Sequence, residues 1–240
     1  MSHFRSSALH LRVFAIAVIL FASAAGFAQT PAPAASPTAS PAAPAAAAPA
    51  PAVIDASPPV PLDQLMSIAP LPDLFLGSAT AQGMIIEYAS LTCVHCAAFH
   101  DTVWPELKAK YVDSGLAKFV LREFPLDPLA TAGFMLARCA GPDKRNLMVD
   151  QLFAQQKTWA FVDKPIQPLL DIVKQLGMSQ IDFETCLKNQ DLYEQVNQSR
   201  DRAAEAFNID STPTFFVNGH KLVGEPALSD FDRWLAPPAK

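Results

Sequence analysis

Between residues 83 and 122 the apolar positions form a short block, then one face of a helix, then a second block. Residues 83–89, GMIIEYA, are apolar and rich in β-favouring side chains, which predicts a strand. Residues 93–113 repeat apolar side chains at nearly every fourth position and predict a helix, which Pro105 should kink. Residues 116–122 predict the next strand. This β-α-β order indicates two parallel strands joined by a right-handed crossover.

Residues 127–207 have a different pattern, because helical stretches follow one another there with no convincing strand between them. After this block, residues 214–217 predict a strand, Asn218-Gly219 a tight hairpin turn, and residues 222–223 the returning strand. Apolar residues at 228, 231 and 235 predict a closing helix. The expected fold class is therefore α/β, with an all-helical domain inserted between a βαβ half and a C-terminal ββα half.

The N-terminus has the pattern of an export signal. Residues 1–12 carry two arginines and no acid, and residues 13–28 are an apolar run that ends in small residues. This combination is typical of a secretory signal peptide, which we expect to occupy residues 1–28 and to be cleaved. A permanent membrane anchor is the alternative, but the apolar run is short for a span of about 20 residues. After cleavage we expect no stable membrane insertion.

Residues 29–61 predict a disordered linker, because ten of the 22 prolines lie there among alanines and serines. Such a segment has almost nothing to bury. The folded part should then span residues 62–238, which is the size of a single domain with a proper core.

Net charge and cysteine content limit the classes of function that this chain can have. The net charge is −5 for the whole chain and becomes −7 once residues 1–28 are removed. An acidic chain is a poor candidate for binding nucleic acid, which requires basic surface to neutralise phosphates. All four cysteines follow residue 28, so in an exported protein they would work where disulfides persist.

The sequence SLTCVHCAAFH, residues 90–100, contains a pair of cysteines that could be a structural bridge, half of a metal site or a redox couple. Cys93 would lie at the start of the predicted helix, where free N–H groups and the helix dipole favour a thiolate. We therefore expect Cys93 to be the nucleophile and Cys96, one turn further, to be its resolving partner. His95 could donate a proton or carry positive charge near Cys93. A stabilised thiolate favours the reduced form and makes the disulfide a strong oxidant.

Three segments together carry a resemblance to a known family. They are EYASLTCVHC with the following FH at 99–100, REFPL at residues 122–126, and TPTF at residues 212–215. In this order they resemble the DsbA family of periplasmic thiol–disulfide oxidoreductases, over roughly residues 62–238. The resemblance implies a thioredoxin-like fold with a helical insertion, and a periplasmic location. Val94 departs from the family pattern, which has proline there, so we expect a tuned redox potential and retained activity.

The resemblance also implies a role for Pro213, and the residues themselves suggest roles for Thr212 and Glu87. Pro213 should form a cis peptide bond beside the cysteines, and the main chain of Thr212 should pair with a substrate as an extended strand. An ordinary strand entry at Thr212-Pro213 is the alternative. Glu87, if buried, would have a raised pKa and could pass a proton to or from Cys96. Alternatively, Glu87 is an edge-strand acid that faces water.

Cys139 and Cys186 fall in the predicted helical block. Two remaining cysteines in an exported protein most often pair, and some DsbA-like proteins have such a second, non-catalytic bridge. A structural disulfide between Cys139 and Cys186 is therefore expected. Two buried free thiols or a regulatory bridge are the alternatives.

The resulting hypothesis is an exported enzyme that introduces disulfides into reduced or unfolded exported proteins through Cys93 and Cys96. It needs no cofactor, and the family implies a membrane reoxidase like DsbB as its partner. One rival is a disulfide isomerase or reductase on the same fold, in which Cys93 stays reduced. The other is a metal-binding protein that uses the cysteine pair with His95 or His100, although a tetrahedral zinc site needs four ligands.

Overall fold

The computed structural model describes residues 52–67 and 69–235. The expected signal peptide, residues 1–28, and most of the expected linker, residues 29–51, lie outside these ranges. Within them, every helix is too short or too polar to cross a membrane.

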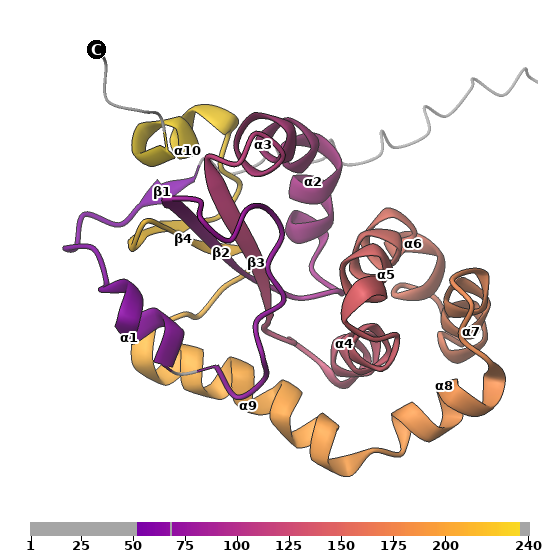
Figure 1. The fold of residues 1–240 in the computed structure, drawn as a ribbon. Coiled ribbons are helices and arrows are strands. Elements are labelled where there is room, and N and C mark those ends of the chain that lie inside the picture. Colours follow the sequence, from indigo (N-terminus) through magenta and orange to yellow (C-terminus); the bar gives the residue numbers. More distant parts are fainter. Residues whose placement is uncertain (1–51, 68, 236–240) are drawn as a thin grey trace, which may run out of the picture. The chain divides into compact units, whose positions relative to one another are not determined.

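A mixed five-stranded sheet forms the centre of the described part (Figure 1). Its order is β1-β5-β4-β2-β3, with β2 parallel to β3 and the other neighbouring pairs antiparallel. The parallel pair confirms the β-α-β unit expected from the sequence. The five strands are β1 (Val53–Ile54), β2 (Gly83–Ala89), β3 (Ala117–Glu123), β4 (Thr214–Val217) and β5 (His220–Val223).

The folded part begins earlier than residue 62, the boundary that composition predicted. Val53 and Ile54 form β1 and pair with β5, and the Val60 N–H donates to the carbonyl of Gly219. The last residues of the expected linker are therefore ordered by contacts with the C-terminal hairpin. Composition could not indicate this, because the hydrogen bonds are made by the main chain and their partners lie more than 150 residues away.

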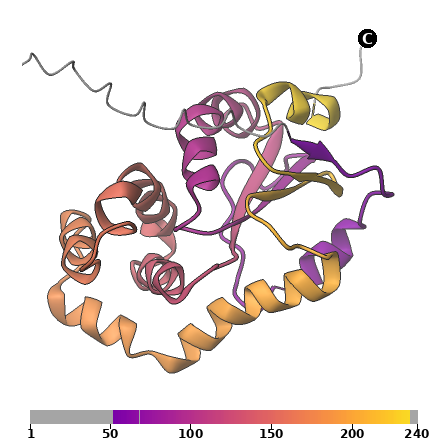
Figure 2. The ribbon, with the colours of Figure 1, turned by 180° about the vertical axis from the view of Figure 1, so that it is seen from behind.

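Helices cover both faces of the sheet (Figures 1 and 2). Because side chains alternate along a strand, Ile85 packs with the first group of helices and Ile86 with the second. The first group is α2 (Val94–Thr102), α3 (Trp104–Leu107), the π-helix η1 (Lys108–Val112) and α10 (Leu228–Leu235). The second group is α1 (Leu62–Ser67) and the C-terminal part of the long helix α9.

The expected helical insertion lies between β3 and β4. It consists of α4 (Pro128–Cys139), α5 (Pro142–Ala154), α6 (Gln156–Trp159), α7 (Ile166–Gln175), α8 (Gln180–Leu187) and α9 (Gln190–Phe207). Their apolar sides join the core that also contains Phe99 of α2. The insertion is thus packed directly against the helix that carries the cysteine pair.

The expected interruption by Pro105 is present at Val103, between α2 and α3. Pro105 lies in the first turn of α3, where its missing N–H costs no helical hydrogen bond. At the other end of the sheet, Asn218 and Gly219 both have positive φ, 48° and 88°, as a tight hairpin turn requires.

Candidate active site

Cys93 follows β2 directly and is the N-cap residue of α2. Its Sγ accepts a hydrogen bond from the main-chain N–H of Cys96 at 3.4 Å. The Cys93 side chain retains a small exposed fraction, with the residue 7% exposed, whereas Cys96 is fully buried. Both are free thiols. An incoming sulfur can therefore reach Cys93 but not Cys96.

The loop before β4 lies against Cys93, although it is about 120 residues away in the sequence. The Cys93 thiol donates to the main-chain carbonyl of Thr212 at 3.2 Å, and the Thr212–Pro213 bond is cis. The Thr212 hydroxyl is buried and makes no hydrogen bond of full geometry among the described residues, but it lies near enough to Cys93 to lower the pKa of that thiol. The site thus places a main-chain carbonyl and a side-chain donor of Thr212 beside the Cys93 sulfur.

Hydrogen bonds lower the pKa of Cys93 from 9.0 to about 6. The Cys96 thiol contributes most, the Thr212 side chain and the N–H groups of Cys96 and His95 add to it, and partial burial opposes them. At neutral pH the Cys93 thiolate therefore predominates in the reduced protein.

The pKa of Cys96 is shifted in the direction opposite to that of Cys93. Burial raises its pKa well above 9.0, and the hydrogen bond to Cys93 and the negative charges of Cys93 and Glu87 raise it further. One thiol of the pair is therefore held as a nucleophile and the other as a proton carrier, an asymmetry that suits thiol–disulfide exchange.

His95 makes a contact that the sequence did not indicate. Its side chain is 58% exposed, and its Nδ1 contacts the carboxylate of Glu225 in the loop after β5. His95 lowers the pKa of Cys93 through its main-chain N–H. The effect that the sequence attributed to the imidazole is thus exerted here by the main chain at the helix start.

Glu87 is fully buried on β2, which has neighbours on both sides. The alternative of a water-facing acid on an edge strand is therefore wrong. Glu87 Oε2 lies 3.0 Å from His100 Nε2, and its other oxygen has no partner among the described residues. His100 follows Cys96 by one helical turn, so the helical spacing could have indicated its place on the same face.

Gln156 is a further site residue that the sequence did not indicate. It lies on α6 in the helical insertion and is buried. Its Nε2 donates to the carbonyls of Leu91 and Cys93, at 2.8 and 2.9 Å. The insertion thereby fixes the turn that carries the nucleophile. No local sequence pattern indicates this role, because the contact depends on how the helical insertion packs against the turn that carries Cys93.

Cys139 and Cys186 lie apart from this site, in the helical insertion. They form a disulfide between α4 and α8, with a sulfur–sulfur distance of 2.13 Å, and are 47 positions apart in the sequence. Cys139 is exposed and Cys186 is buried. Throughout residues 52–67 and 69–235, no three His, Cys, Asp or Glu side chains are grouped so as to hold a metal ion.

Comparisons with known proteins agree with this geometry. The model of the thioredoxin family matches residues 71–236. A Rickettsia conorii protein with the provisional name protein-disulfide oxidoreductase is 34% identical over 148 residues, which is 61% of this chain. The aligned part covers 53% of that relative, so the chain spans about half the length of the curated relatives it matches.

Solved structures place the chain among DsbA-like proteins of thioredoxin fold. The crystal structure of Wolbachia pipientis alpha-DsbA1 is 28% identical, with a TM-score of 0.65, and the match covers 71% of this chain and 92% of that one. A protein-disulfide isomerase from Novosphingobium aromaticivorans, 22% identical with a TM-score of 0.61, shares the fold; the match covers 68% of this chain and 96% of that one.

Proposed function

Because this chain belongs to the thioredoxin family and is DsbA-like within it, we propose that it is an exported oxidase that introduces disulfides into other exported proteins. The observation that carries the proposal is the placement of Cys93 as the N-cap residue of α2, where its sulfur accepts the Cys96 N–H, next to a fully buried Cys96. A pKa of about 6 makes Cys93 a good leaving group and favours the reduced protein, so the disulfide form gives up its bond readily.

The proposed reaction begins with the Cys93–Cys96 disulfide. A substrate thiolate attacks Cys93 Sγ, the bond to Cys96 breaks, and Cys96 leaves as a thiolate that takes up a proton. A second substrate thiolate then attacks the substrate sulfur of this mixed disulfide and releases the Cys93 thiolate. Two electrons pass from the substrate to the cysteine pair, one proton goes to Cys96, and the other goes to water.

Four neighbouring residues have roles in this scheme. Thr212 offers its main chain to a substrate in extended conformation next to Cys93, and Pro213 shapes that loop. Glu87 exchanges a proton with Cys96, whose pKa is raised by burial first and by the charge of Glu87 among other causes. His95, exposed beside Cys93, contacts the substrate or the redox partner at the rim of the site.

The remaining features belong to the protein's location and stability. The proposed location is the periplasm, reached through the signal peptide, with reduced exported proteins as substrates. Reoxidation of Cys93 and Cys96 is assigned to a membrane partner of the DsbB type. The Cys139–Cys186 bridge has a structural role in the helical insertion.

Equilibration of the purified protein with glutathione buffers tests the proposal. We expect the Cys93–Cys96 disulfide to be more oxidising than glutathione, and the oxidised protein to form disulfides in reduced, denatured ribonuclease. Cys93→Ser should abolish both reactions, while a Cys139→Ser/Cys186→Ala variant keeps them. If the protein instead reactivates scrambled ribonuclease faster than it oxidises the reduced form, the isomerase alternative is correct.

A further inference from the structure

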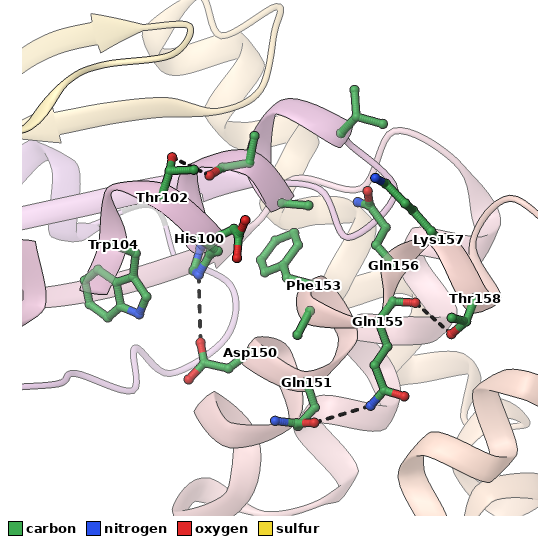
Figure 3. A pocket seen from close by; sticks show the side chains of 15 residues that line it. His100, Thr102, Trp104, Asp150, Gln151, Phe153, Gln155, Gln156, Lys157 and Thr158 are labelled. Atoms are coloured by element: carbon green, nitrogen blue, oxygen red, sulfur yellow. Dashed lines mark hydrogen bonds and ion pairs between the residues drawn. The ribbon is translucent and has the colours of Figure 1, made fainter. Parts of the chain in front are cut away.

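A cavity of about 640 Å³ lies between α2 and the α5–α6 segment of the helical insertion (Figure 3). His100 of α2 and Asp150 of α5 are in its wall, together with Trp104 and Phe153. Val94, from the cysteine motif, also borders it. The cavity therefore reaches the back of the helix that carries Cys93 and Cys96.

Three titratable side chains form a line from the sheet to this cavity. Glu87 is fully buried, and its Oε2 is 3.0 Å from His100 Nε2. His100 is 4% exposed in its side chain, and its Nδ1 lies 3.8 Å from the Asp150 carboxylate, as the dashed line in Figure 3 marks. The Asp150 side chain is 49% exposed. The line thus runs from a position without water to one in contact with it.

Two atoms in this line have unused hydrogen-bonding capacity. Glu87 Oε1 and His100 Nδ1 are buried, and neither has a hydrogen-bond partner among the described residues. The distance of 3.8 Å between His100 Nδ1 and the Asp150 carboxylate is slightly too long for a direct hydrogen bond, and a small rotation of the half-exposed Asp150 side chain would close it. An imidazole can accept a proton on one nitrogen and release one from the other.

Other charged groups act on this line from each neighbouring element. Burial raises the pKa of Asp150, the charge of Glu87 also raises it, and His100, Lys108 and Arg145 lower it. Asp101 and Lys157 lie in the cavity wall as well. On its remaining sides His100 meets aromatic rings, stacking on Phe153 with a centroid distance of 4.4 Å.

The proposed exchange reaction requires a proton route between the buried Cys96 and water. Cys96 is fully buried and must gain a proton when it leaves and lose one when it attacks. Glu87 is equally buried and can hold only one proton, so it must be refilled or emptied from water in every cycle. Within the described residues, His100 is its one hydrogen-bond partner.

We propose that His100 and Asp150 carry protons between Glu87 and the water of this cavity, so that the helical insertion takes part in each redox cycle. This inference rests on the proposed function. When Cys96 leaves, the proton moves from Asp150 through His100 and Glu87 to its sulfur; when Cys96 attacks, the proton moves the opposite way. His100 does not touch the reacting sulfurs and is a positioning and relay residue.

Reaction of the reduced protein with dithiobis(nitrobenzoate) separates the two cysteines. In the first phase Cys93 attacks the reagent, forms a mixed disulfide and releases one thionitrobenzoate. In the second phase Cys96 loses its proton, attacks Cys93, and releases the other. Only the second phase needs the relay, so the first phase is an internal control in every variant.

We expect His100→Gln to slow the second phase about tenfold at neutral pH and to leave the first phase within about twofold of the wild type. The deficit should shrink as the pH rises, because hydroxide then takes the proton directly. Asp150→Asn should slow the same phase severalfold. In His100→Ala, added imidazole should restore most of the rate, because the cavity leaves room for it.

The matched control is Gln151→Leu, which changes another polar residue of the cavity wall without touching His100. It should react like the wild type in both phases. Second-phase rates and pH profiles of the His100 and Asp150 variants that match the wild type would overturn the relay, as would a folded His100→Ala that imidazole cannot restore. If the His100 variants do not fold, Asp150→Asn decides. A wild-type protein without a second phase would instead refute the proposed function.

Discussion

The imidazole of His95 contacts the carboxylate of Glu225, and so joins the cysteine motif to the loop after β5 across 130 residues of sequence. Glu225 is only 22% exposed in its side chain, whereas His95 is 58% exposed. The positive charge that His95 could contribute near Cys93 is therefore balanced by a neighbouring negative charge.

Replacing Glu225 with glutamine should make the protein a stronger oxidant. The substitution removes a negative charge near Cys93 and so favours its thiolate. Because the pair is partly exposed, the effect should be at most about 1 kcal/mol, or about fivefold in the equilibrium constant with glutathione. Glu225→Asp is the control and should change this constant less. A shift in the opposite direction would show that the pair supports the thiolate.

The Cys93 thiolate should make the stability of the reduced protein depend on pH. Its pKa is about 6 in the folded state against 9.0 ordinarily, so the stabilisation is complete above about pH 9 and is lost as the pH falls toward 6. It amounts to at most roughly 4 kcal/mol. Urea unfolding between pH 6 and 9 measures it. The oxidised protein, in which Cys93 does not titrate, should show no such slope.

Thr212→Val should raise the pKa of Cys93 and weaken the protein as an oxidant. The Thr212 side chain is one of the donors that lower this pKa, and valine keeps the shape without the hydroxyl. Loss of a hydrogen bond to a charged sulfur is worth about 1.5 kcal/mol, or about tenfold in the glutathione equilibrium. Thr212→Ser, which keeps the hydroxyl, should stay close to the wild type. Equal constants for all three proteins would contradict this role.

Removing the second disulfide should destabilise the fold and leave the exchange reaction intact. The bridge spans 47 residues, and closing a loop of that length stabilises by about 4 kcal/mol in the chain-entropy model. A Cys139→Ser/Cys186→Ala protein should therefore unfold at a clearly lower urea concentration with unchanged oxidation of thiols. An unchanged unfolding midpoint, or two free thiols in the native protein with Cys93 and Cys96 oxidised, would show that the bridge has no structural role.

Glu123 should govern the loss of stability in acid. Burial alone would raise its pKa, but Arg145 and Arg138 outweigh that effect and lower it to about 2. Its contribution is thus complete above about pH 4.5 and is lost as the pH falls toward 2. Glu123→Gln should flatten this dependence in acid unfolding. At neutral pH it should cost about 3–5 kcal/mol, because buried Arg145 loses its charged partner.

The sequence predicts the central strands well, because their apolar runs are short and clearly bounded. The predicted range matches β2 and β4 to the residue, and β3 within one residue at each end. The sequence does not single out α9, since few of its 18 residues are apolar. It also misses β1, a two-residue strand whose pairing is decided by β5.

For the site, the sequence indicates the groups that carry the chemistry but not those that hold them in place. Cys93, Cys96 and Thr212 belong to motifs that can be read along the chain. Glu225 and Gln156 act through a loop and a helix whose positions depend on the packing of the whole fold. His100 could be predicted in part: helical spacing places it on the same helix face as Cys96, but does not indicate that Glu87 is its partner.

The two hydrogen bonds of Gln156 bear on how this molecule could be engineered or could have evolved. Trimming the chain to a minimal domain by excising α4–α9 would leave the carbonyls of Leu91 and Cys93 without their donor. The same holds for a chimaera that exchanges the insertion for another helical block, unless that block places an amide at the same point. The insertion is therefore not an independent module, and its sequence is constrained by the cysteine turn as well as by its own core.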